Sequence, residues 1–476
     1  MTKMKIRIAL VALTIALLGA VPAVAAIPDA PAIDGRHLGL LWVLPFVGIL
    51  LSIAVMPLAA PSFWHHHFGK VSAVWALLVI VPFAAIHGVP TAIYEIVHLL
   101  LLDYIPFIVL LLALFTVTGG IHVRGNIHGS PSMNTALLAI GTVLAGWMGT
   151  TGASMLLIRP MIRANDDRKH KIHVFVFFIF LVSNIGGALT PLGDPPLFLG
   201  FLKGVSFFWT TTHLFSEMLV CAIVLLALFY ALDSYWYRRE GHLKRDPTPE
   251  SPIRIEGGIN IILLMAVVGV VLASGTWKPG VEFSIFHVPL ELQNVLRDLA
   301  LVAICALSLK LTSRKIRTDN VFGWGPMLEV AKLFAGIFIT IAPALAILRA
   351  GKEGAMAPLV ALVTGPDGQP IDAWYFWLSG ILSSFLDNAP TYLVFFNLAG
   401  GDAELLMGTL ASTLAAISCG AVFMGANTYI GNAPNFMVKA VVEDAGIRMP
   451  SFFGYMAWSC AILVPLFVLL TFIFFL

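Results

Sequence analysis

Long apolar stretches alternate with short polar ones along the whole chain, and their length predicts helices that cross a membrane. A run of about 20 apolar residues spans the hydrocarbon core of a bilayer. Two apolar segments, 132–158 and 374–396, are interrupted midway by polar residues, and we predict that they form re-entrant hairpins. The predicted spans lie near 38–60, 71–89, 101–121, 172–208, 214–236, 258–275, 293–311, 322–349, 405–438 and 452–476.

The order of these segments is the same in the two halves of the chain. Residues 187–199 (GALTPLGDPPLFL) and 425–437 (GANTYIGNAPNFM), 238 positions apart, are identical at six of thirteen positions. Self-similarity at a fixed spacing indicates an internal duplication. We therefore predict two repeats, residues 27–237 and 258–476, joined by a charged, proline-containing linker at 238–257.

The distribution of basic residues orients the two repeats. If the mature chain starts outside and alternates, 18 Lys and Arg fall in inner loops and six in outer loops, as the positive-inside rule requires. The first hairpin then leads into the basic loop 159–171, whereas the second leads into 397–406, which has no Lys or Arg. The predicted fold class is therefore an all-α polytopic membrane protein with two inverted repeats of about five transmembrane helices, each with a re-entrant helical hairpin and a broken helix.

Composition narrows the choice of function. The chain is 59% hydrophobic and 11% charged, with a mean hydropathy of +0.92, which leaves little for a soluble domain. The net charge of +2 offers no basic surface for nucleic acid, and the four cysteines are not spaced as metal ligands. Residues 1–26 are predicted to be a signal peptide, because basic residues at the N-terminus are followed by an apolar run and by Ala23-Val24-Ala25. The alternative is an uncleaved first helix.

Polar breaks occur at repeat-related places, in 148–154, 183–196, 386–391 and 425–435. Interrupted helices at corresponding positions of two halves point to the binding site of a secondary transporter. Asp194 and Asp387 lie in these breaks, and an ionisable residue inside a membrane is a functional candidate. Capping of a helix N-terminus is the alternative role for each carboxylate. Asp103, at the outer start of a span, is expected to be interfacial.

The breaks also carry a family resemblance. SNIGGALTPLGDPP (183–196), followed by DNAPT (387–391) and GNAPN (431–435), resembles the ion transporter superfamily. Within it, the chain is similar to NhaD-type sodium/proton antiporters and related citrate-transporter-like membrane proteins. The resemblance implies a homodimer in the bacterial inner membrane, a site-bearing domain that slides against a scaffold, and no cofactor besides the transported ions. It also implies a first cation site of Thr150, Thr151, Ser154, Ser183, Asn184, Thr190 and Asp194, and a second of Asp387, Asn388, Thr391, Asn427, Thr428 and Asn432.

The function predicted from these features is exchange of Na⁺, with Li⁺ as a second candidate ion, for H⁺. Carbonyl, hydroxyl and carboxylate oxygens suit a hard cation. An ionised Asp194 can hold Na⁺ and a protonated one cannot, so competition for one carboxylate couples the two gradients; Asp387 is the second choice for this role.

Three alternatives remain open. The first is a Na⁺- or H⁺-coupled transporter of citrate or a dicarboxylate, although neither hairpin tip has the Ser-Asn-Thr triplet of that branch. Arsenite or another oxyanion is a further substrate class. An intramembrane aspartic protease would need two paired aspartates. Pro191-Leu192-Gly193 precedes Asp194 in place of the Gly-x-Gly of such proteases, so we expect no enzyme activity.

Overall fold

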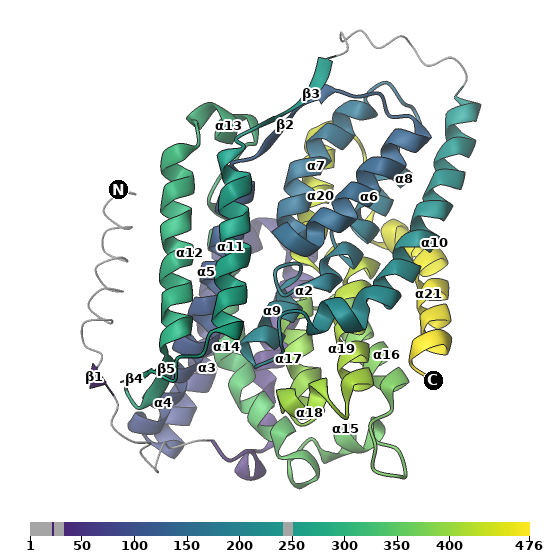
Figure 1. The fold of residues 1–476 in the computed structure, drawn as a ribbon. Helices are drawn as coiled ribbons and strands as arrows, with labels where there is room; N and C mark the ends of the chain where they lie inside the picture. Colours follow the sequence, from purple (N-terminus) through teal and green to yellow (C-terminus); the bar gives the residue numbers. More distant parts are fainter. Residues whose placement is uncertain (1–20, 23–32, 241–250) are drawn as a thin grey trace.

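The computed structural model describes residues 21–22, 33–240 and 251–476 (Figure 1). Apart from Val21 and Pro22, the predicted signal segment 1–26 lies outside the described residues, as does the 241–250 part of the predicted linker. Within the described part of the chain, nine helices are long and apolar enough to cross a membrane. The prediction of an all-α polytopic membrane protein is therefore confirmed, whereas the boundaries of the two repeats stay a prediction.

The helices pack as two bundles (Figure 1). The first, which we call the scaffold bundle, takes the first three spans of each half. Within it α3 packs on α2 and α14, and α12 packs on α5 and α11. Its helices are α2 (Leu44–Ala59, preceded by the 3₁₀ turn Leu40–Val43), α3 (Pro61–His87), α4 (Val89–Leu99), α5 (Ile105–Thr118), α11 (Ile259–Thr276), α12 (Leu292–Leu311) and α14 (Gly325–Arg349).

The second bundle, which we call the site bundle, contains both hairpins and both broken helices. Its helices are α6 (Pro131–Met148), α7 (Thr150–Ala164), α8 (Ile172–Leu181), α9 (Pro195–Leu202), α10 (Trp209–Arg239), α16 (Asp372–Phe385), α17 (Asn388–Leu398), α19 (Ala411–Phe423), α20 (Ala433–Asp444) and α21 (Phe452–Phe474). The pairs α6–α7 and α16–α17 are the predicted hairpins, and they occupy opposite ends of the molecule in Figure 1. This is the inverted arrangement that the sequence predicts.

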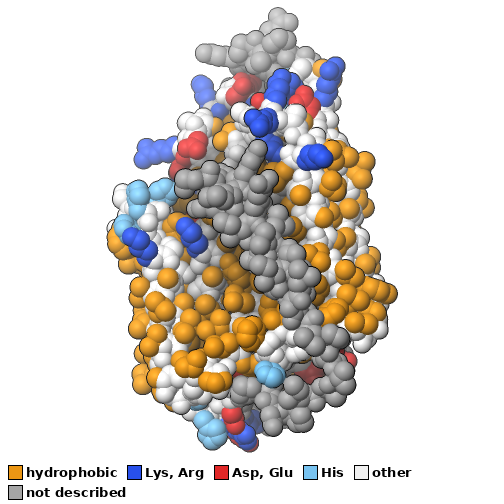
Figure 2. All heavy atoms as spheres, turned by 90° about the vertical axis from the view of Figure 1, so that its left-hand side faces the viewer, with side chains coloured by type: hydrophobic (Ala, Val, Ile, Leu, Met, Phe, Trp, Pro, Cys, Tyr) orange, Lys and Arg blue, Asp and Glu red, His pale blue; other side chains and the backbone are white. Residues whose placement is uncertain are grey.

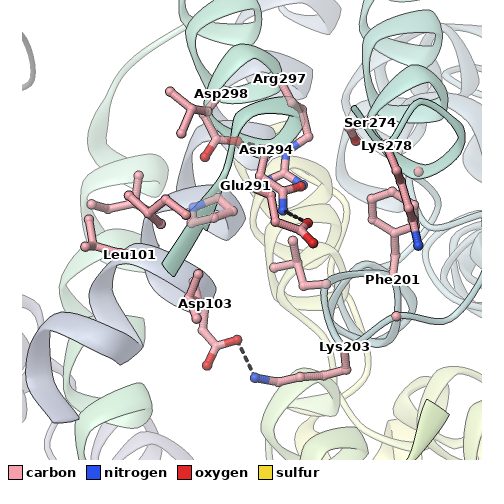
Figure 3. Close-up of a pocket in the computed structure, with 18 of the residues that line it drawn as sticks. Leu101, Asp103, Phe201, Lys203, Ser274, Lys278, Glu291, Asn294, Arg297 and Asp298 are labelled. Carbon is pink, nitrogen blue, oxygen red and sulfur yellow. Dashed lines mark hydrogen bonds and ion pairs between the residues drawn. The ribbon is translucent and has the colours of Figure 1, made fainter. Parts of the chain in front are cut away.

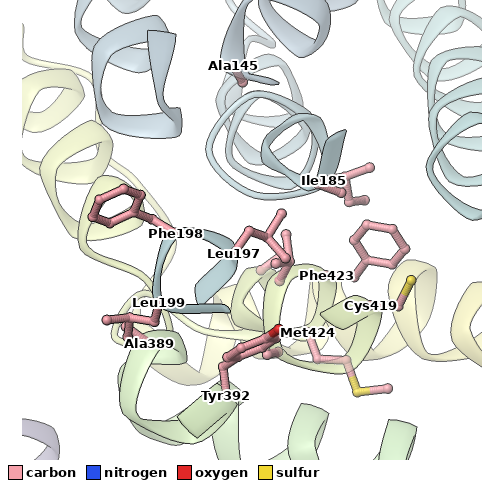
Figure 4. Close-up of a cluster of buried hydrophobic side chains, with 14 of the residues drawn as sticks. Ala145, Ile185, Leu197, Phe198, Leu199, Ala389, Tyr392, Cys419, Phe423 and Met424 are labelled. Carbon is pink, nitrogen blue, oxygen red and sulfur yellow. The ribbon is translucent and has the colours of Figure 1, made fainter. Parts of the chain in front are cut away.

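The core of the site bundle is built from both halves. In α8, every residue from His173 to Leu181 is buried, as expected for a helix that is apolar on all sides. Figure 4 shows Ile185 and Leu197 of the first half near Phe423 of the second, and Leu199 of the first half beside Ala389 of the second. Because lipid tails are as apolar as these side chains, close van der Waals packing holds such helices together. The two halves therefore form one packed body around the breaks.

The two broken helices have the same backbone path. Each loses its α-helical form, passes through a short 3₁₀ segment (Ile185–Leu189 and Met424–Asn427) and resumes as a helix with proline in its first turn. Thr190 (φ −142°, ψ 161°) matches Thr428 (φ −137°, ψ 169°). Asp194 (φ −142°, ψ 143°) likewise matches Asn432 (φ −151°, ψ 139°). The sequence repeat is thus also a repeat of conformation.

The structure adds elements that the sequence pattern did not predict. Most of the segment 90–100, expected to be a loop, belongs to α4 (Val89–Leu99) and extends the third span, because the chain turns at Gly88 (φ 89°) directly after α3. A π-helical segment, Leu100–Tyr104, joins α4 to α5. The short helices outside the two bundles are α13 (Arg314–Asp319), α15 (Ala357–Leu362), α18 (Ala403–Met407) and the 3₁₀ turns Gly35–His37 and Gly351–Glu353.

Two small antiparallel sheets also lie outside the predicted pattern, where loops leave the bundles and their backbone groups pair. The strands β1 (Val21–Pro22), β4 (Glu282–Ile285) and β5 (Val288–Glu291) form one sheet in the order β1-β4-β5. The strands β2 (His122–Asn126) and β3 (Ser251–Glu256) form the other, with Val123 opposite Ile255. Arg124 forms ion pairs with Glu256 at 3.3 Å and with Asp319 at 3.0 Å, which ties this sheet to α13.

The two ends of the molecule differ in charge. Figure 2 shows Lys and Arg side chains gathered at the end where Figure 1 has β2, β3 and α13, above a broad apolar belt. The positive-inside rule assigns this end to the inside, and we call it the inner end. The opposite end, with α15, α18 and the β4–β5 hairpin, is the outer end. The exposed apolar belt, which includes Leu44, Leu77 and Val81, matches a lipid-facing surface.

Two repeat-related glycines allow the breaks to close tightly, which gives a first prediction. A Cβ at Gly193 would lie 2.2 Å from the carbonyl oxygen of Gly187, and one at Gly431 would lie 2.6 Å from that of Gly425. We expect Gly193→Ala and Gly431→Ala each to lower the free energy of unfolding by about 1–3 kcal/mol, the usual cost of overpacking. Thermal unfolding in detergent measures this loss. Gly269→Ala, where a Cβ meets open space, is the control, and equal losses in all three variants would contradict the packing argument.

Candidate functional site

Asp194 is the centre of the polar region between the hairpin tips. Its side chain is 1% exposed, and three donors from three different elements reach its carboxylate. Thr150 Oγ1, at the start of α7, donates to Oδ1 at 2.9 Å, and Asn388 Nδ2, at the start of α17, donates to Oδ2 at 2.5 Å. Asn432 Nδ2, from the second broken helix, donates to Oδ1 at 3.1 Å. Both hairpin tips and both breaks therefore meet at one carboxylate.

Asp194 and Asn432 are equivalent positions of the two repeats, and they contact each other directly. Repeat-equivalent residues that touch must lie at the pseudo-twofold axis relating the halves, as in a symmetric dimer interface. Two aspartates here would repel each other, whereas an amide opposite one carboxylate donates a hydrogen bond to it. The second half therefore supplies a donor at the place where the first half supplies the charge.

Amide side chains extend this contact between the halves. Asn432 Nδ2 also lies 3.1 Å from the Ser183 carbonyl oxygen and 3.2 Å from Asn184 Oδ1. Asn184 Nδ2 donates to Asn435 Oδ1 at 2.7 Å, and Asn435 Nδ2 donates to the carbonyl oxygens of Gly425 and Thr428 at 2.8 and 2.9 Å. All three amides are buried, so their mutual hydrogen bonds replace those that water would make.

The hydroxyl groups of Thr190 and Thr428 connect each break to the hairpin of its own half. Thr190 donates to the carbonyl oxygen of Gly146, and Thr428 donates to the carbonyl oxygen of Ser384. Both the donor and the acceptor of the second bond lie 238 positions after those of the first. Each hydroxyl also accepts a backbone N–H, from Leu192 and from Ile430, both at 3.2 Å. The two hydroxyls therefore provide hydrogen-bond partners for backbone groups that the helix breaks leave without one.

The remaining members of the first predicted set lie beside this centre. Ser154 Oγ and Ser183 Oγ are 2.8 Å apart and fully buried, so they join α7 to the first break. Thr151 is partly exposed and lines a cavity described below. Thr150 and Thr151 occupy the first turn of α7, which begins after Gly149 (φ 82°), a conformation that favours glycine.

Asp387, in the second predicted set, has the geometry of an N-cap. Its Oδ1 accepts the backbone N–H of Ala389 at 3.0 Å, and the Thr391 hydroxyl donates to the Asp387 carbonyl oxygen at 3.0 Å. The residue is partly exposed. Asn388 and Asn432, which the family resemblance assigned to a second site, contact Asp194 instead, so the contacts do not divide the residues into two separate sets.

At the site, two buried amide oxygens have no hydrogen-bond donor among the described residues. They are Oδ1 of Asn388 and Oδ1 of Asn427, whose Nδ2 atoms donate to Asp194 and to Ser384 Oγ. A buried acceptor without a partner is costly, and it indicates a water or an ion that completes the coordination. Both oxygens belong to residues predicted as cation ligands.

A small cavity reaches Asp194 from the inner side. It has a volume of about 120 Å³ and lies between the tip of α7, the start of α9 and the scaffold helices α5 and α14. Pro326, Met327 and Val330, from the first turns of α14, form its inner wall. Asp194 is the only charged residue among the described residues that line it. A species entering this cavity therefore meets one carboxylate, hydroxyl groups and apolar side chains.

Helix ends set the electrostatics of the site. The N-termini of α7, α9, α17 and α20 converge on it, at Thr150, Pro195, Asn388 and Ala433. A helix N-terminus carries a partial positive charge, which stabilises a nearby anion. Here the nearby anions are the two aspartates, so the partial charges favour their ionised forms while burial disfavours them. The balance between charged and neutral Asp194 is thus set by opposing effects.

Sequence reasoning missed several residues that hold the site together. Asn435 and Ser384 bridge elements as described above, and Tyr455 donates from α21 to the carbonyl oxygen of Ala426 at 2.8 Å. Asn435 was visible as the last residue of the GNAPN motif. Ser384 aligns with Gly146 in the repeat, where the contact is made by a backbone carbonyl, so no shared residue type marked it.

Comparison with known proteins identifies the class and then the family. A polytopic helical protein with paired hairpins and broken helices around a buried polar centre has the architecture of a secondary transporter. Residues 35–475 match the model of a family described as "Putative citrate transport", and the chain belongs to this family. It is thus a member of a family of multi-pass membrane transport proteins.

The chain is also similar to three mycobacterial proteins. It is 24% identical over 327 residues to "Uncharacterized transporter Mb2703" of Mycobacterium bovis and to "Uncharacterized transporter Rv2684" of Mycobacterium tuberculosis. It is 25% identical over 329 residues to a "46 kDa membrane protein" of Mycobacterium leprae. Each similarity covers 67% of this chain and 71% of the relative.

The repeat-related threonines generate a second prediction. Thr190→Val and Thr428→Val remove a hydroxyl that satisfies both a buried carbonyl and an N–H, at nearly constant side-chain volume. We expect each to lower the free energy of unfolding by about 1–3 kcal/mol, with similar values for the two variants because the contacts are equivalent. Thr212→Val, on the exposed face of α10, is the control and should be nearly neutral. The idea would be wrong if thermal unfolding gave all three variants the same midpoint.

Proposed function

We propose that this protein is a secondary transporter that exchanges Na⁺ for H⁺ across the bacterial inner membrane, with Asp194 as the group for which the two ions compete. Li⁺ is a second candidate ion. The observation that carries the proposal is the lining of the cavity at Asp194, which holds this carboxylate and, among the described residues, no basic side chain. A cation is attracted to such a cavity and an anion is repelled by it.

The surrounding groups fit a dehydrated cation. Hard cations prefer oxygen ligands, and the Asp194 carboxylate is near the unpartnered amide oxygen of Asn388. The hydroxyl of Thr150 can turn its lone pairs toward an ion, because it donates to Asp194 with a proton that is free to rotate. With Na⁺ bound, the carboxylate is ionised; with H⁺ bound, it is neutral and a poor ligand. One ion therefore displaces the other.

The size of the cavity supports an inorganic ion. Its volume is about 120 Å³, and a water molecule takes about 30 Å³ in the liquid. A few waters or a partly hydrated cation therefore fit. Pockets for organic ligands are larger, roughly 300–1,000 Å³. A tricarboxylate with its hydration shell needs more room than this cavity at Asp194 provides.

Transport of citrate or a dicarboxylate is the second candidate function, and one observation favours it. Four helix N-termini converge on the site, and such ends can hold a substrate carboxylate in a transporter. The family description points the same way. In this case Asp194 and Asp387 would bind a co-transported cation, whose charge would offset that of the substrate.

The third prediction tests the role of Asp194. In everted vesicles, Na⁺-induced proton movement should fall to the level of empty vesicles in Asp194→Asn, because an amide has nearly the size of the carboxylate but carries no charge and cannot exchange a proton for Na⁺. Asp387→Asn keeps the helix cap, since Asn also caps well, so it isolates the effect of that charge. Asp367→Asn, on an exposed loop, is the matched control. Wild-type exchange in Asp194→Asn would overturn the assignment.

The fourth prediction separates the two candidate functions. Purified protein in proteoliposomes should convert an imposed Na⁺ gradient into a pH change, and should not accumulate radiolabelled citrate. The same vesicles tested with Na⁺, Li⁺ and K⁺ give the ion preference. Citrate uptake that requires a Na⁺ or H⁺ gradient, without Na⁺-driven pH change in the absence of citrate, would establish the second candidate instead.

A further inference from the structure

A large cavity opens between the two bundles at the outer end of the molecule (Figure 3). Its volume is about 880 Å³. The scaffold side of its wall comes from the α4–α5 connection, α11, α12 and the β4–β5 hairpin, and the site-bundle side comes from the last turn of α9 and the residues after it. Ion binding at Asp194 does not involve this cavity directly, although α9 begins directly after Asp194 and its last turn lines the cavity.

The large cavity at the outer end, which we call the outer cavity, and the small cavity at Asp194, which we call the inner cavity, lie next to each other where α5 faces α9. We call this contact between α5 and α9 the seam. On α5, Val109 lines the outer cavity and Leu110 lines the inner one. On α9, Phe201 lines the outer cavity, and Phe198 lines the inner one together with Asp194. Three residues of helix correspond to about 4.5 Å, so only one layer of side chains separates the two spaces.

Aromatic rings form this layer on the α9 side. The rings of Phe198 and Phe201 are stacked, with centroids 6.0 Å apart and an interplanar angle of 23°. Phe198 is 1% exposed and Phe201 is 9% exposed. These two stacked rings, one lining each cavity, fill the α9 side of the layer between the outer cavity and Asp194. In this conformation the carboxylate therefore has space on its inner side and a closed seam on its outer side.

An ion pair crosses the same seam at its outer mouth. Lys203 Nζ, directly after α9, lies 2.5 Å from Asp103 Oδ1 in the π-helical segment that precedes α5 (Figure 3). Asp103 is 5% exposed, so it is buried, whereas the sequence analysis expected an interfacial residue. Single π-helical turns within helices are frequent at functional sites. The pair joins the scaffold bundle to the segment of the site bundle that carries Asp194.

We propose that the outer access route to Asp194 follows the seam between α5 and α9, that Phe198 and Phe201 close it, and that the Asp103–Lys203 ion pair holds it closed. The inference rests on the proposed function only in taking Asp194 as the transport site. For the route to open, α9 must move away from α5, and this movement separates the two charges. Each charge then needs water, which the outer cavity can supply. Removing either charge should therefore increase the fraction of molecules in which the outer route to Asp194 is open.

Thiol labelling tests the route, with single cysteines placed in a chain whose four native cysteines are replaced. Phe201→Cys should react from outside with a membrane-impermeant reagent, because it lines the outer cavity. Phe198→Cys should react slowly from outside and faster from inside in everted vesicles. Leu199→Cys is the matched control on α9: it is 1% exposed, lines neither cavity, and faces the core near Ala389 and Tyr392 in Figure 4. It should remain unlabelled from both sides until the protein is denatured.

Breaking the ion pair should then change these rates in opposite directions. With Asp103→Asn, or independently with Lys203→Gln, the outside rate at Phe198→Cys should rise at least about fivefold and the inside rate should fall, as expected for loss of one ion pair. The double variant Asp103→Lys, Lys203→Asp should restore the slow outside rate. Unchanged rates in both single variants, or a parallel rise at Leu199→Cys, would overturn the proposal.

The labelling experiment is independent of the transported ion, because it needs no gradient. If the labelling pattern is found and Na⁺-driven proton movement is absent, the proposed function fails and the route stands. If Asp194→Asn abolishes exchange but labelling does not follow the ion pair, the route fails and the proposed function stands. Size-exclusion profiles and complete labelling after denaturation identify any variant that has not folded.

Discussion

The structure depends on one constraint: backbone N–H and C=O groups freed inside a membrane must find partners within the protein, because lipid offers none. The described part of the chain breaks midway at four places, the two hairpin tips and the two broken helices, and each break leaves such groups at the helix ends beside it. Threonine hydroxyls and asparagine amides meet part of this demand. The Thr190 and Thr428 hydroxyls each serve one carbonyl and at least one N–H, and Asn435 serves two carbonyls. The polar residues of the breaks are therefore needed for the fold before they are needed for any ion.

Because the same polar residues serve both the fold and the candidate site, some features of the site could be predicted from the sequence and others could not. Spans, hairpins and breaks follow from the length of apolar runs and from the positions of Gly, Pro and polar residues, because the bilayer imposes those patterns locally. Asp194 was identifiable because a charge at mid-depth is costly. The contacts of Asn388 and Asn432 with Asp194 were not predictable, since they join residues 194 and 238 positions apart. Only the packing of the two halves brings these side chains together.

Elements outside the repeat pattern were the hardest to predict. The helix α4 was read as a loop between two spans, whereas most of the π-helical segment after it fell inside the predicted span 101–121. In the structure Lys203 neutralises Asp103, so a charge that suggested an interface is buried against the other bundle. The strands β2 and β3 are equally non-local. Their pairing depends on two chain crossings between the bundles that both emerge at the inner end.

The chemistry of the candidate site depends on the pair of repeat-equivalent residues, Asp194 and Asn432, at the pseudo-twofold axis. An ancestral duplication places equivalent residues opposite each other there, and two aspartates at this distance would share a proton, as in a protease dyad. With Asn432 opposite Asp194, the axis instead carries a single negative charge that an amide helps to hold. One carboxylate is matched by one monovalent cation or by one proton, and it cannot be neutralised by both at once. The departure from symmetry at this one pair is therefore what would suit the site to the proposed exchange, while the symmetric threonines and glycines around it keep both breaks in the same shape.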